Sequence, residues 1–261
     1  KKHEENLQSI QSGIQKAVDE QMRAERMKTE LITNVSHDIK TPLTSIINYV
    51  DLLEKEELSN ETAEGYLEVL ERQSNRLKKL IEDLIEASKA STGNLAVHLE
   101  KLEAGVSVVQ IVGEFEDKLN AADLTLLIQK PETPVYVMAD GRHFWRVIDN
   151  LMNNICKYAQ PGTRVYVDLR ENGGQVELIF RNTSRYPLNI SSEELMERFV
   201  RGDESRNTEG SGLGISIAKS LMELMGGSFM LYVDGDLFKV VLGFAQIAEE
   251  KEPLDEDESG K

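Results

Sequence analysis

The N-terminal part of the chain carries a helical pattern that is too long for one compact domain. Between Glu4 and Glu54 only Gly13 and Pro42 would interrupt a helix. A helix of that length measures about 75 Å at ~1.5 Å per residue, which no single small domain buries. Its apolar residues repeat with the alternating three and four spacing of a bundle seam: Ile32, Val35, Ile39, Leu43, Ile46, Val50 and Leu53. This seam requires another helix to cover it.

A second amphipathic helix follows a polar segment at residues 56–61, which we interpret as a turn. Its apolar face comprises Tyr66, Leu67, Leu70, Leu77, Leu80, Ile81, Leu84 and Ile85. The two helices should form an antiparallel hairpin, which leaves half of each apolar stripe exposed. Two hairpins that pair into a dimeric four-helix bundle bury the remainder, so we expect a homodimer.

His37 and Asp38 place an imidazole beside a carboxylate on the first helix. At about 100° per residue His37 lies nearly opposite Val35 and Ile39, so its ring should face solvent. A histidine among apolar residues is more often a buried core residue, and the periodicity argues against that alternative here. An exposed imidazole with an ordinary pKa of ~6.5 is a usable nucleophile, and the neighbouring carboxylate can take its proton.

Charge and cysteine content argue against several classes of protein. A net charge of −16 over 261 residues disfavours nucleic acid as a partner, because such binding depends on Lys and Arg at phosphates. The single cysteine, Cys156, excludes an internal disulfide and fits a reducing compartment. No stretch of the sequence approaches the ~20 apolar residues of a membrane span. The chain begins at Lys1 without a methionine, which suggests that an upstream segment is missing.

After a hinge-like sequence at residues 91–94, the pattern changes to short strands that alternate with helices, which predicts an α/β sandwich. We expect strands at 95–102, 124–129, 135–138, 163–170 and 175–182, helices at 107–121, 140–158 and 212–225, and a final hairpin that turns at 234–236. The acidic tail, residues 248–261, has little apolar content and is predicted to be disordered.

The helix predicted at 140–158 carries polar side chains in register on one face. Asn150, Asn154 and Lys157 lie roughly 120° around the helix axis from its apolar stripe. Two amide oxygens and an ammonium suit a hydrated Mg²⁺ ion together with phosphate oxygens. A simple solvated face is an equally good interpretation of this helix taken alone.

A glycine cluster opens the helix predicted at 212–225. Gly210, Gly212 and Gly214 surround Ser211 and Leu213. Glycines allow close backbone approach, and a helix N-terminus offers free N–H groups and a partial positive charge to a phosphate. A flexible turn is the alternative. The long polar segment before this cluster, residues 183–209, has the length and composition of a lid over a ligand.

Four segments resemble the sequence boxes of the sensor histidine kinases of two-component systems. Residues 34–43 resemble the phosphoacceptor box, with His37, Asp38, Thr41, Pro42 and Leu43 in the family's positions. Residues 149–158 resemble the N box, residues 195–206 resemble the F box, and residues 210–214 resemble the G2 box. The boxes occur in the family's order, so the resemblance extends over most of the chain.

The resemblance implies a role for each matching residue. His37 would be phosphorylated on a ring nitrogen from Mg-ATP, with Asp38 as the base, and Thr41 would position water for the reverse phosphatase reaction. The ATP-binding residues would be Asn150, Asn154, Lys157, Tyr158, Asn182, Arg201, Gly210, Gly212, Leu213 and Gly214, with Asn154 as the Mg²⁺ ligand and Arg201 at the γ-phosphate. Related ATPases hold a glutamate that activates water where this chain has Asn150. An amide cannot take that proton, which disfavours an ATP-hydrolysing clamp.

The same resemblance implies the organisation of the chain and its partners. We expect a signalling helix at 1–28, a dimerisation and phosphoacceptor domain at 29–92, an ATP-binding domain of Bergerat type at 93–247, and the tail at 248–261. The partner would be the receiver domain of a response regulator, and nucleic acid is not expected. The chain would be the cytoplasmic part of a bacterial plasma-membrane protein, attached to the membrane only through the missing upstream segment.

One departure from the family pattern falls at the G1 box, which normally reads Asp-x-Gly-x-Gly. The aligned stretch here begins at Asn182 and contains no glycine. The aspartate that faces adenine is thus replaced by an amide, which carries both a donor and an acceptor and by flipping can meet either purine. We therefore expect weaker discrimination between ATP and GTP. The degraded box also motivates an alternative function, a noncatalytic dimeric scaffold that docks a regulator.

Overall fold

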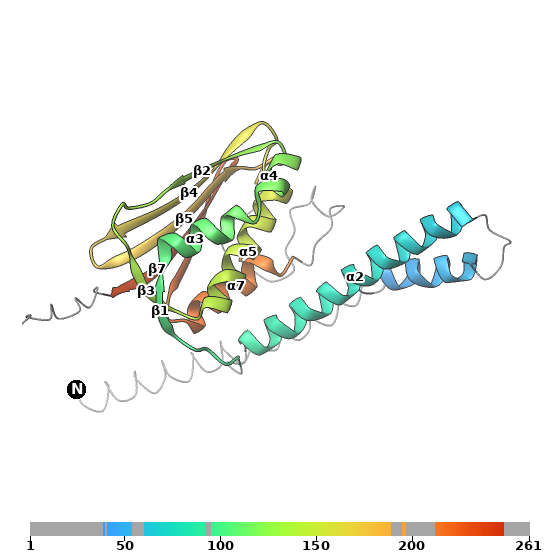
Figure 1. The fold of residues 1–261 in the computed structure, drawn as a ribbon, viewed down its shortest axis with the longest axis horizontal. Coiled ribbons are helices and arrows are strands. Elements are labelled where there is room, and N and C mark those ends of the chain that lie inside the picture. The colour runs from blue at the N-terminus through green and yellow to red at the C-terminus, as the bar shows by residue number, and fades with distance from the viewer. Residues whose placement is uncertain are drawn as a thin grey trace, which may run out of the picture. The chain divides into compact units, whose positions relative to one another are not determined.

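The computed structural model of the protein describes residues 39, 41–53, 60–91, 95–188, 195–196 and 212–247 (Figure 1). Two compact units contain them, a helical unit made mainly of residues up to 86 and an α/β unit made mainly of residues from 87 onward. None of the helices in these ranges is long and apolar enough to cross a membrane. The predicted signalling helix at 1–28 and the predicted disordered tail at 248–261 lie outside the described residues.

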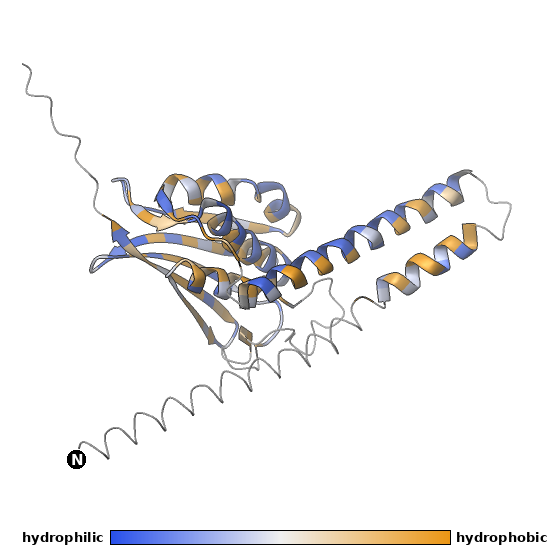
Figure 2. Cartoon of the chain, turned by 90° about the horizontal axis from the view of Figure 1, so that it is seen from below, coloured by the Kyte–Doolittle hydropathy of each residue, from blue (hydrophilic) through white to orange (hydrophobic). Residues whose placement is uncertain are grey.

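The helical unit contains two helices that pack side by side. Ile39 and residues 41–53 are helical, so Pro42 does not end the first helix, and α2 spans Asn60–Ser91. The rings of Tyr49 and Tyr66 meet edge-on with their centroids 5.3 Å apart. Hydrophobic and hydrophilic residues alternate around both helices (Figure 2). The predicted pair of amphipathic helices is present.

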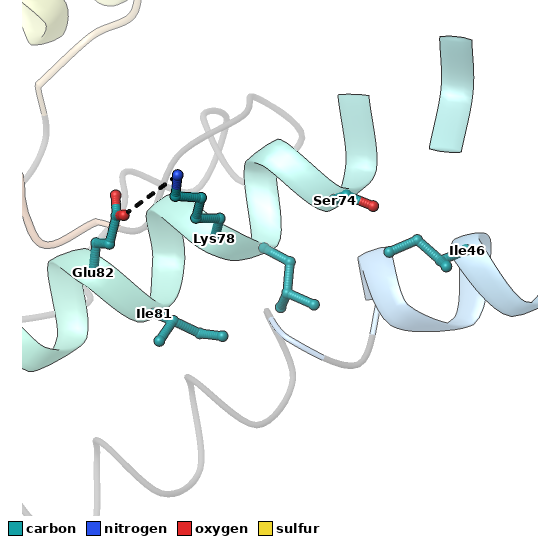
Figure 3. Close-up of a pocket in the computed structure, with 6 residues that line it drawn as sticks. Ile46, Ser74, Lys78, Ile81 and Glu82 are labelled. Carbon is teal, nitrogen blue, oxygen red and sulfur yellow. Dashed lines mark ion pairs between the residues drawn. The ribbon is translucent and has the colours of Figure 1, made fainter. Parts of the chain in front are cut away.

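An apolar groove of about 420 Å³ lies between these two helices (Figure 3). Ile46 of the first helix and Leu77 and Ile81 of α2 supply its apolar lining, and Lys78 and Glu82 lie beside them with Nζ and Oε1 4.0 Å apart. Further large apolar side chains of the two helices are exposed: Leu43, Ile47, Val50, Leu52, Leu67 and Ile85. The helical unit therefore leaves much of its apolar surface uncovered.

Seven strands form one mixed sheet in the α/β unit: β1 (Glu100–Glu103), β2 (Leu124–Gln129), β3 (Tyr136–Ala139), β4 (Thr163–Asn172), β5 (Gln175–Thr183), β6 (Ser228–Asp234) and β7 (Leu237–Ile247). The strand order is β1-β3-β7-β5-β4-β2, and β6 also pairs with β7. Among the strand pairs of the described residues, only that of β2 with β4 is parallel. Gly173 and Gly174 link β4 to β5 with φ values of 59° and 84°, a backbone region that other residues rarely adopt.

Helices lie over one face of this sheet (Figure 1): α3 (Ala104–Gly113), α4 (Glu116–Ala121), α5 (Gly141–Tyr158) and α7 (Gly214–Leu224). The central helix α5 packs against both α3 and α7. Its buried face carries Phe144, Val147, Ile148, Leu151, Met152 and Ile155. The predicted α/β sandwich is confirmed. The polar residues of α5 are fixed in position because the opposite side of this helix is buried in the core.

Two predicted elements near residue 100 are wrong in their bounds. The strand expected at 95–102 is confined to β1, and the helix expected at 107–121 begins at Ala104 and is divided into α3 and α4. The Glu103 side chain caps α3 by accepting a hydrogen bond from the amide of Gly105 at 3.1 Å. Glutamate is not among the preferred N-cap residues, so the pattern alone misplaces the helix start.

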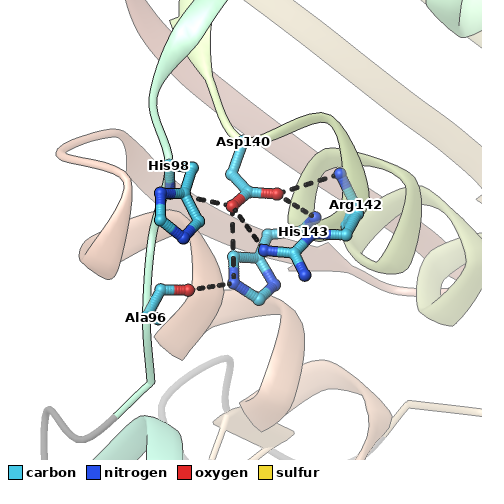
Figure 4. A network of polar contacts seen from close by, with 5 residues as sticks. All are labelled: Ala96, His98, Asp140, Arg142 and His143. Atoms are coloured by element: carbon cyan, nitrogen blue, oxygen red, sulfur yellow. Dashed lines mark hydrogen bonds and ion pairs between the residues drawn. The ribbon is translucent and has the colours of Figure 1, made fainter.

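The start of α5 is fixed by Asp140, which the sequence pattern places inside the helix and the structure places at its N-cap. Asp140 is 2% exposed, and its Oδ1 accepts hydrogen bonds from the amides of Arg142 at 3.0 Å and His143 at 3.4 Å. Its Oδ2 accepts from the amide of His98 at 2.9 Å (Figure 4). Burial raises the pKa of Asp140, but these hydrogen bonds and the nearby His143 ring outweigh it and hold the pKa well below its usual range.

We expect Asp140→Ala to lower the free energy of unfolding by about 2–4 kcal/mol at neutral pH. The loss combines an N-cap, worth ~1 kcal/mol, with the hydrogen bond that the His98 amide donates to the Asp140 carboxylate, worth ~1.5–3 kcal/mol as a bond to a charged group. Because the folded-state pKa of Asp140 is depressed, its stabilisation is complete above the unfolded pKa of ~3.9 and is lost as pH falls through the folded pKa. Urea titrations followed through Trp145 at neutral and acidic pH measure both effects.

Arg142→Ala is the matched control for this prediction. The Arg142 side chain is 73% exposed and its Nη2 lies 3.3 Å from Asp140 Oδ2, so its removal should cost less than about 1 kcal/mol. Equal losses for the two variants, or a loss for Asp140→Ala that does not shrink in acid, would contradict the assigned role of the carboxylate.

Candidate functional site

The polar face of α5 carries the residues that the sequence analysis selected, and α7 begins beside it. Asn150, Asn154 and Lys157 are each partly exposed, whereas the apolar side of the helix is buried. A Cβ atom on Gly214, the first residue of α7, would lie 3.4 Å from Asn150 Oδ1. Asn150 Nδ2 is buried and has no hydrogen-bond partner among the described residues. The structure thus brings the N box and the last glycine of the G2 box together.

The end of β5 is tied to the end of α5 by backbone hydrogen bonds. The Arg185 amide donates to the Tyr158 carbonyl at 2.8 Å, and the Gln160 amide donates to the Thr183 carbonyl at 2.8 Å. Lys157 Nζ lies 5.1 Å from the centroid of the Tyr158 ring. The segment that follows Asn182 therefore lies against the turn of α5 that carries Lys157 and Tyr158.

Asn182 is a buried amide with one unsatisfied atom. The residue is 4% exposed, and its Nδ2 donates to the carbonyl of Thr183 at 3.2 Å. Its Oδ1 is buried and has no hydrogen-bond partner within the described residues. An unpaired buried acceptor costs ~1–3 kcal/mol, so this atom is suited to a ligand that brings a donor. Asn150 Nδ2, on α5, is likewise buried without a partner in the described part of the chain, and it is suited to a ligand that brings an acceptor.

Gly212 and Leu213 precede α7 and differ in backbone conformation and burial. Gly212 adopts a φ of 69°, which favours glycine, and Leu213 is 1% exposed. Of the other predicted site residues, Thr41 is an exposed residue of the helical unit. His37, Asp38, Arg201 and Gly210 lie outside the described residues, so their roles stay predictions.

A further face of α5 carries a polar network that the sequence analysis missed. Asn153 Nδ2 donates to Asp149 Oδ1 at 2.7 Å, Lys118 Nζ donates to Asn153 Oδ1 at 3.2 Å, and Arg146 Nη1 donates to Asp149 Oδ2 at 3.2 Å. Asn153 is therefore used within the fold. Its neighbour Asn154 makes no such bond among the described residues. Asp149 and Asn153 are four residues apart, so they lie on one face of a helix, and this spacing in the sequence could have predicted their contact.

A metal at this site would depend on amide oxygens. Within the described ranges no group of three or more His, Cys, Asp and Glu side chains could hold a metal ion. The Asn154 amide oxygen is a hard ligand of the kind that Mg²⁺ accepts, with phosphate oxygens and water for the remaining positions. The Asn154 amide oxygen on α5 thus fits a metal ion whose other ligands are phosphate oxygens and water.

Two family models match the chain. Residues 27–93 match the His Kinase A (phospho-acceptor) domain, and residues 139–252 match the Histidine kinase-, DNA gyrase B-, and HSP90-like ATPase. The two matches together cover more than half of the chain. The first includes His37 and Thr41, and the second includes Asn150, Asn154 and Asn182.

Curated relatives match over most of this chain's length. WalK, a sensor protein kinase of Staphylococcus aureus, is 29% identical over 216 residues, which are 80% of this chain and 51% of that protein. DivL, a sensor protein of Caulobacter vibrioides, is 27% identical over 223 residues, which are 85% of this chain and 28% of that protein. The chain therefore spans about half or less of the length of these relatives.

Solved structures show the same fold. The Acinetobacter baumannii histidine kinase AdeS superposes with a TM-score of 0.62 at 18% identity, over 80% of this chain and 97% of that chain. The histidine kinase ThkA in its complex with the response regulator protein TrrA gives a TM-score of 0.65 at 18% identity, over 90% of this chain and 67% of that chain. At these identities the likeness concerns the fold alone.

Proposed function

The chain belongs to the sensor histidine kinases, and from this premise we propose that it transfers the γ-phosphoryl group of Mg-ATP to His37. The observation that carries the proposal is the contact between α5 and the start of α7: a Cβ atom on Gly214 would lie 3.4 Å from Asn150 Oδ1, and Asn150 Nδ2 is buried without a partner among the described residues. Incubation of the chain with Mg²⁺ and γ-labelled ATP tests it. Label that is stable in base and labile in acid, as a phosphorus–nitrogen bond is, supports the proposal.

The nucleotide would be held by residues from three elements. Asn182 Oδ1 would accept from the amino group of adenine, and Tyr158 would pack close to the base. Lys157 and the free amides at the start of α7 would bind phosphate oxygens, as helix N-termini do. Mg²⁺ bound at Asn154 would neutralise charge on those oxygens. Asn150 has no basic group with which to activate water, so ATP would be kept for transfer rather than hydrolysed.

The transfer itself would use two side chains of the first helix. A ring nitrogen of His37 attacks the γ-phosphorus, and the bond from that phosphorus to the bridging oxygen breaks to leave ADP. Asp38 takes the proton from the other ring nitrogen. In a second step, an aspartate oxygen of a response-regulator receiver domain attacks the phosphorus, the phosphorus–nitrogen bond breaks, and His37 is regenerated.

A homodimer would complete the helical unit. The groove lined by Ile46, Leu77 and Ile81, with the exposed apolar residues along both helices, is the surface that a second hairpin would bury in a four-helix bundle. Attachment to a membrane would occur through an upstream segment. A monomer in sedimentation measurements at micromolar concentration would contradict this part of the proposal.

Thr41→Ala should separate two activities of the helical unit. The substitution removes a hydroxyl that would position water, but it keeps His37 and Asp38, so phosphorylation of His37 should persist while dephosphorylation of the regulator slows at least tenfold. Single-turnover rates of both reactions measure the effect, and Thr44→Ala, one turn along the same helix, is the matched control. A similar loss in both reactions would show that Thr41 has no separate role.

Asn154→Ala should abolish Mg²⁺-dependent binding of ATP, because a hard cation loses a positioned oxygen ligand. Asn153→Ala is the matched control, since the Asn153 amide is already bonded to Asp149 and Lys118 and should leave the Mg²⁺ dependence unchanged. Calorimetric titrations with and without Mg²⁺ measure both variants. Unchanged affinity in Asn154→Ala would remove Asn154 from the metal site.

A noncatalytic dimeric scaffold that docks a regulator is the second candidate function. The residue favouring it is Asn182, which stands where the family has an aspartate in the G1 box. Such a scaffold would dimerise and bind the regulator but would acquire no base-stable label from ATP. The labelling experiment therefore separates the two candidates.

A further inference from the structure

The face of the sheet that points away from the helices carries two cations side by side. The Phe244 ring of β7 packs against Phe144 of α5 with the centroids 5.6 Å apart, so this side of β7 points toward the helices (Figure 1). Side chains alternate along a strand, and Lys239 therefore points to the opposite face. Arg181 of β5 lies directly opposite Lys239 in the register and points the same way.

Each of these cations lies over a tyrosine ring of the strand beside it. The Arg181 guanidinium carbon is 5.1 Å from the centroid of Tyr166 on β4, and Lys239 Nζ is 5.2 Å from the centroid of Tyr232 on β6. The registers place these four residues opposite one another across four neighbouring strands. We call Tyr166, Arg181, Lys239 and Tyr232 the cation row. The row itself contains no carboxylate.

Arg181 is held in place by a carboxylate that it shares with another arginine. Asp168 of β4 is buried, and its Oδ2 pairs with both Arg181 and Arg170, the latter at 2.9 Å. One carboxylate neutralises only one of the two guanidinium groups. The Arg181 side chain is 34% exposed, so its positive charge is fixed in position and accessible to an external group.

Lys239 contacts a tyrosine ring but has no carboxylate partner in the described part of the chain. Glu177 of β5 lies opposite Arg170, and Asp234 ends β6, two residues beyond the tyrosine of the row. The residue opposite Lys239 on β5 is Arg181. Like charges that face each other on neighbouring strands destabilise a sheet, so an external carboxylate close to both would relieve a repulsion and form two ion pairs.

Apolar side chains beside the cation row are exposed as well. Leu127 of β2 lies opposite Tyr166 and continues the row by one strand, and Met230 of β6 lies two residues before Tyr232. Leu127, Met230 and Tyr232 are all exposed large side chains. Tyrosine, methionine and arginine are enriched where proteins bind one another. This combination fits a polypeptide better than a small anion.

We propose that the cation row binds an acidic segment of another protein, with a carboxylate between Arg181 and Lys239 and apolar side chains on Met230 and Tyr232. Charge complementarity supports this partner, because the row carries two positive charges in a chain whose net charge is −16. A short segment interacts mainly with charges within a Debye length of ~8 Å, whereas a membrane or a nucleic acid would extend over more of the acidic chain. The proposal concerns the sheet face opposite Asn182, so it does not depend on the phosphorylation of His37.

The test is the affinity of the chain for a dye-labelled peptide of repeated Glu-Glu-Leu, measured by fluorescence anisotropy. A peptide of repeated Gln-Gln-Leu should bind about tenfold more weakly, since it offers no carboxylate. Lys239→Gln should weaken binding of the acidic peptide about fivefold, and Lys239→Arg, which keeps the charge, should preserve the affinity. Lys219→Gln is the matched control, because it removes the same charge from α7, on the helical side of the sheet.

Every other outcome would overturn the proposal. Equal affinity for the two peptides would show that the chain does not select carboxylates. Equal affinities of Lys239→Gln and Lys219→Gln would place the peptide away from the cation row. Vesicles of phosphatidylglycerol or oligouridine that displace the peptide from the native chain but not from Lys239→Gln would assign the row to a membrane or to nucleic acid. A weaker dimer of Lys239→Gln in sedimentation would assign the row to a second copy of the chain.

Discussion

We expect His37→Gln to abolish the transfer of base-stable label from γ-labelled ATP to the chain. Glutamine has no ring nitrogen with a lone pair to attack phosphorus, so the loss should be complete. Binding of ATP and dimerisation should persist, because the helical periodicity directs the residue toward solvent and away from the bundle seam. Autoradiography after base treatment, calorimetry with ATP and sedimentation provide the three readouts.

The chain offers a matched control for this substitution. It contains four histidines, and His98 has an exposed side chain that the proposed reaction does not use. His98→Gln should therefore keep full labelling. Label that persists in His37→Gln would identify the acceptor as another of the four residues. Loss of ATP binding or of the dimer in His37→Gln would instead show that the side chain supports the fold.

Local patterns in the sequence predicted the elements of the site well. The apolar period of α5 placed Phe144, Ile148 and Leu151 in the core and left Asn150 and Asn154 on a polar face, as the structure has them. This worked because a helix fixes the direction of its side chains through spacing alone. The turn at Gly173 and Gly174 was equally predictable, since both glycines adopt positive φ values.

Contacts between segments distant in the sequence could not be predicted in the same way. The hydrogen bond from the His98 amide to Asp140 joins residues 42 positions apart, and it holds a segment, residues 95–99, that belongs to no strand. A stretch rich in Leu and Val predicts a strand whether or not another strand is available beside it. The strand order likewise depends on these distant pairings, which no local pattern contains.

The role of Asn182 depends on such a contact as well. From the sequence, an amide that is free to flip could meet adenine with its oxygen or guanine with its nitrogen. In the structure Nδ2 donates to the Thr183 carbonyl and Oδ1 is the unpartnered atom. To meet the guanine carbonyl, the amide must give up this hydrogen bond, worth about 0.5–1.5 kcal/mol, and turn its oxygen toward another carbonyl. The native site should therefore still prefer ATP to GTP.

We expect Asn182→Asp to raise the ratio of ATP affinity to GTP affinity about tenfold, or ~1.4 kcal/mol. A carboxylate has no donor, so GTP loses the option of meeting a flipped amide. Affinity for ATP itself should not improve. The new carboxylate would be buried at a position now 4% exposed, and it would lose the hydrogen bond to Thr183.

Asn182→Leu provides the opposite change at the same position. Leucine has the same branched side-chain skeleton but no acceptor for the amino group of adenine, so ATP should lose about tenfold in affinity while GTP changes little, and the ratio should fall. Competition binding of both nucleotides to the native chain and the two variants measures these shifts. A ratio that rises in Asn182→Asp and falls in Asn182→Leu would assign base recognition to Asn182. A ratio that stays constant in both would show that another group recognises the base, and the unpartnered Oδ1 would then require a different ligand.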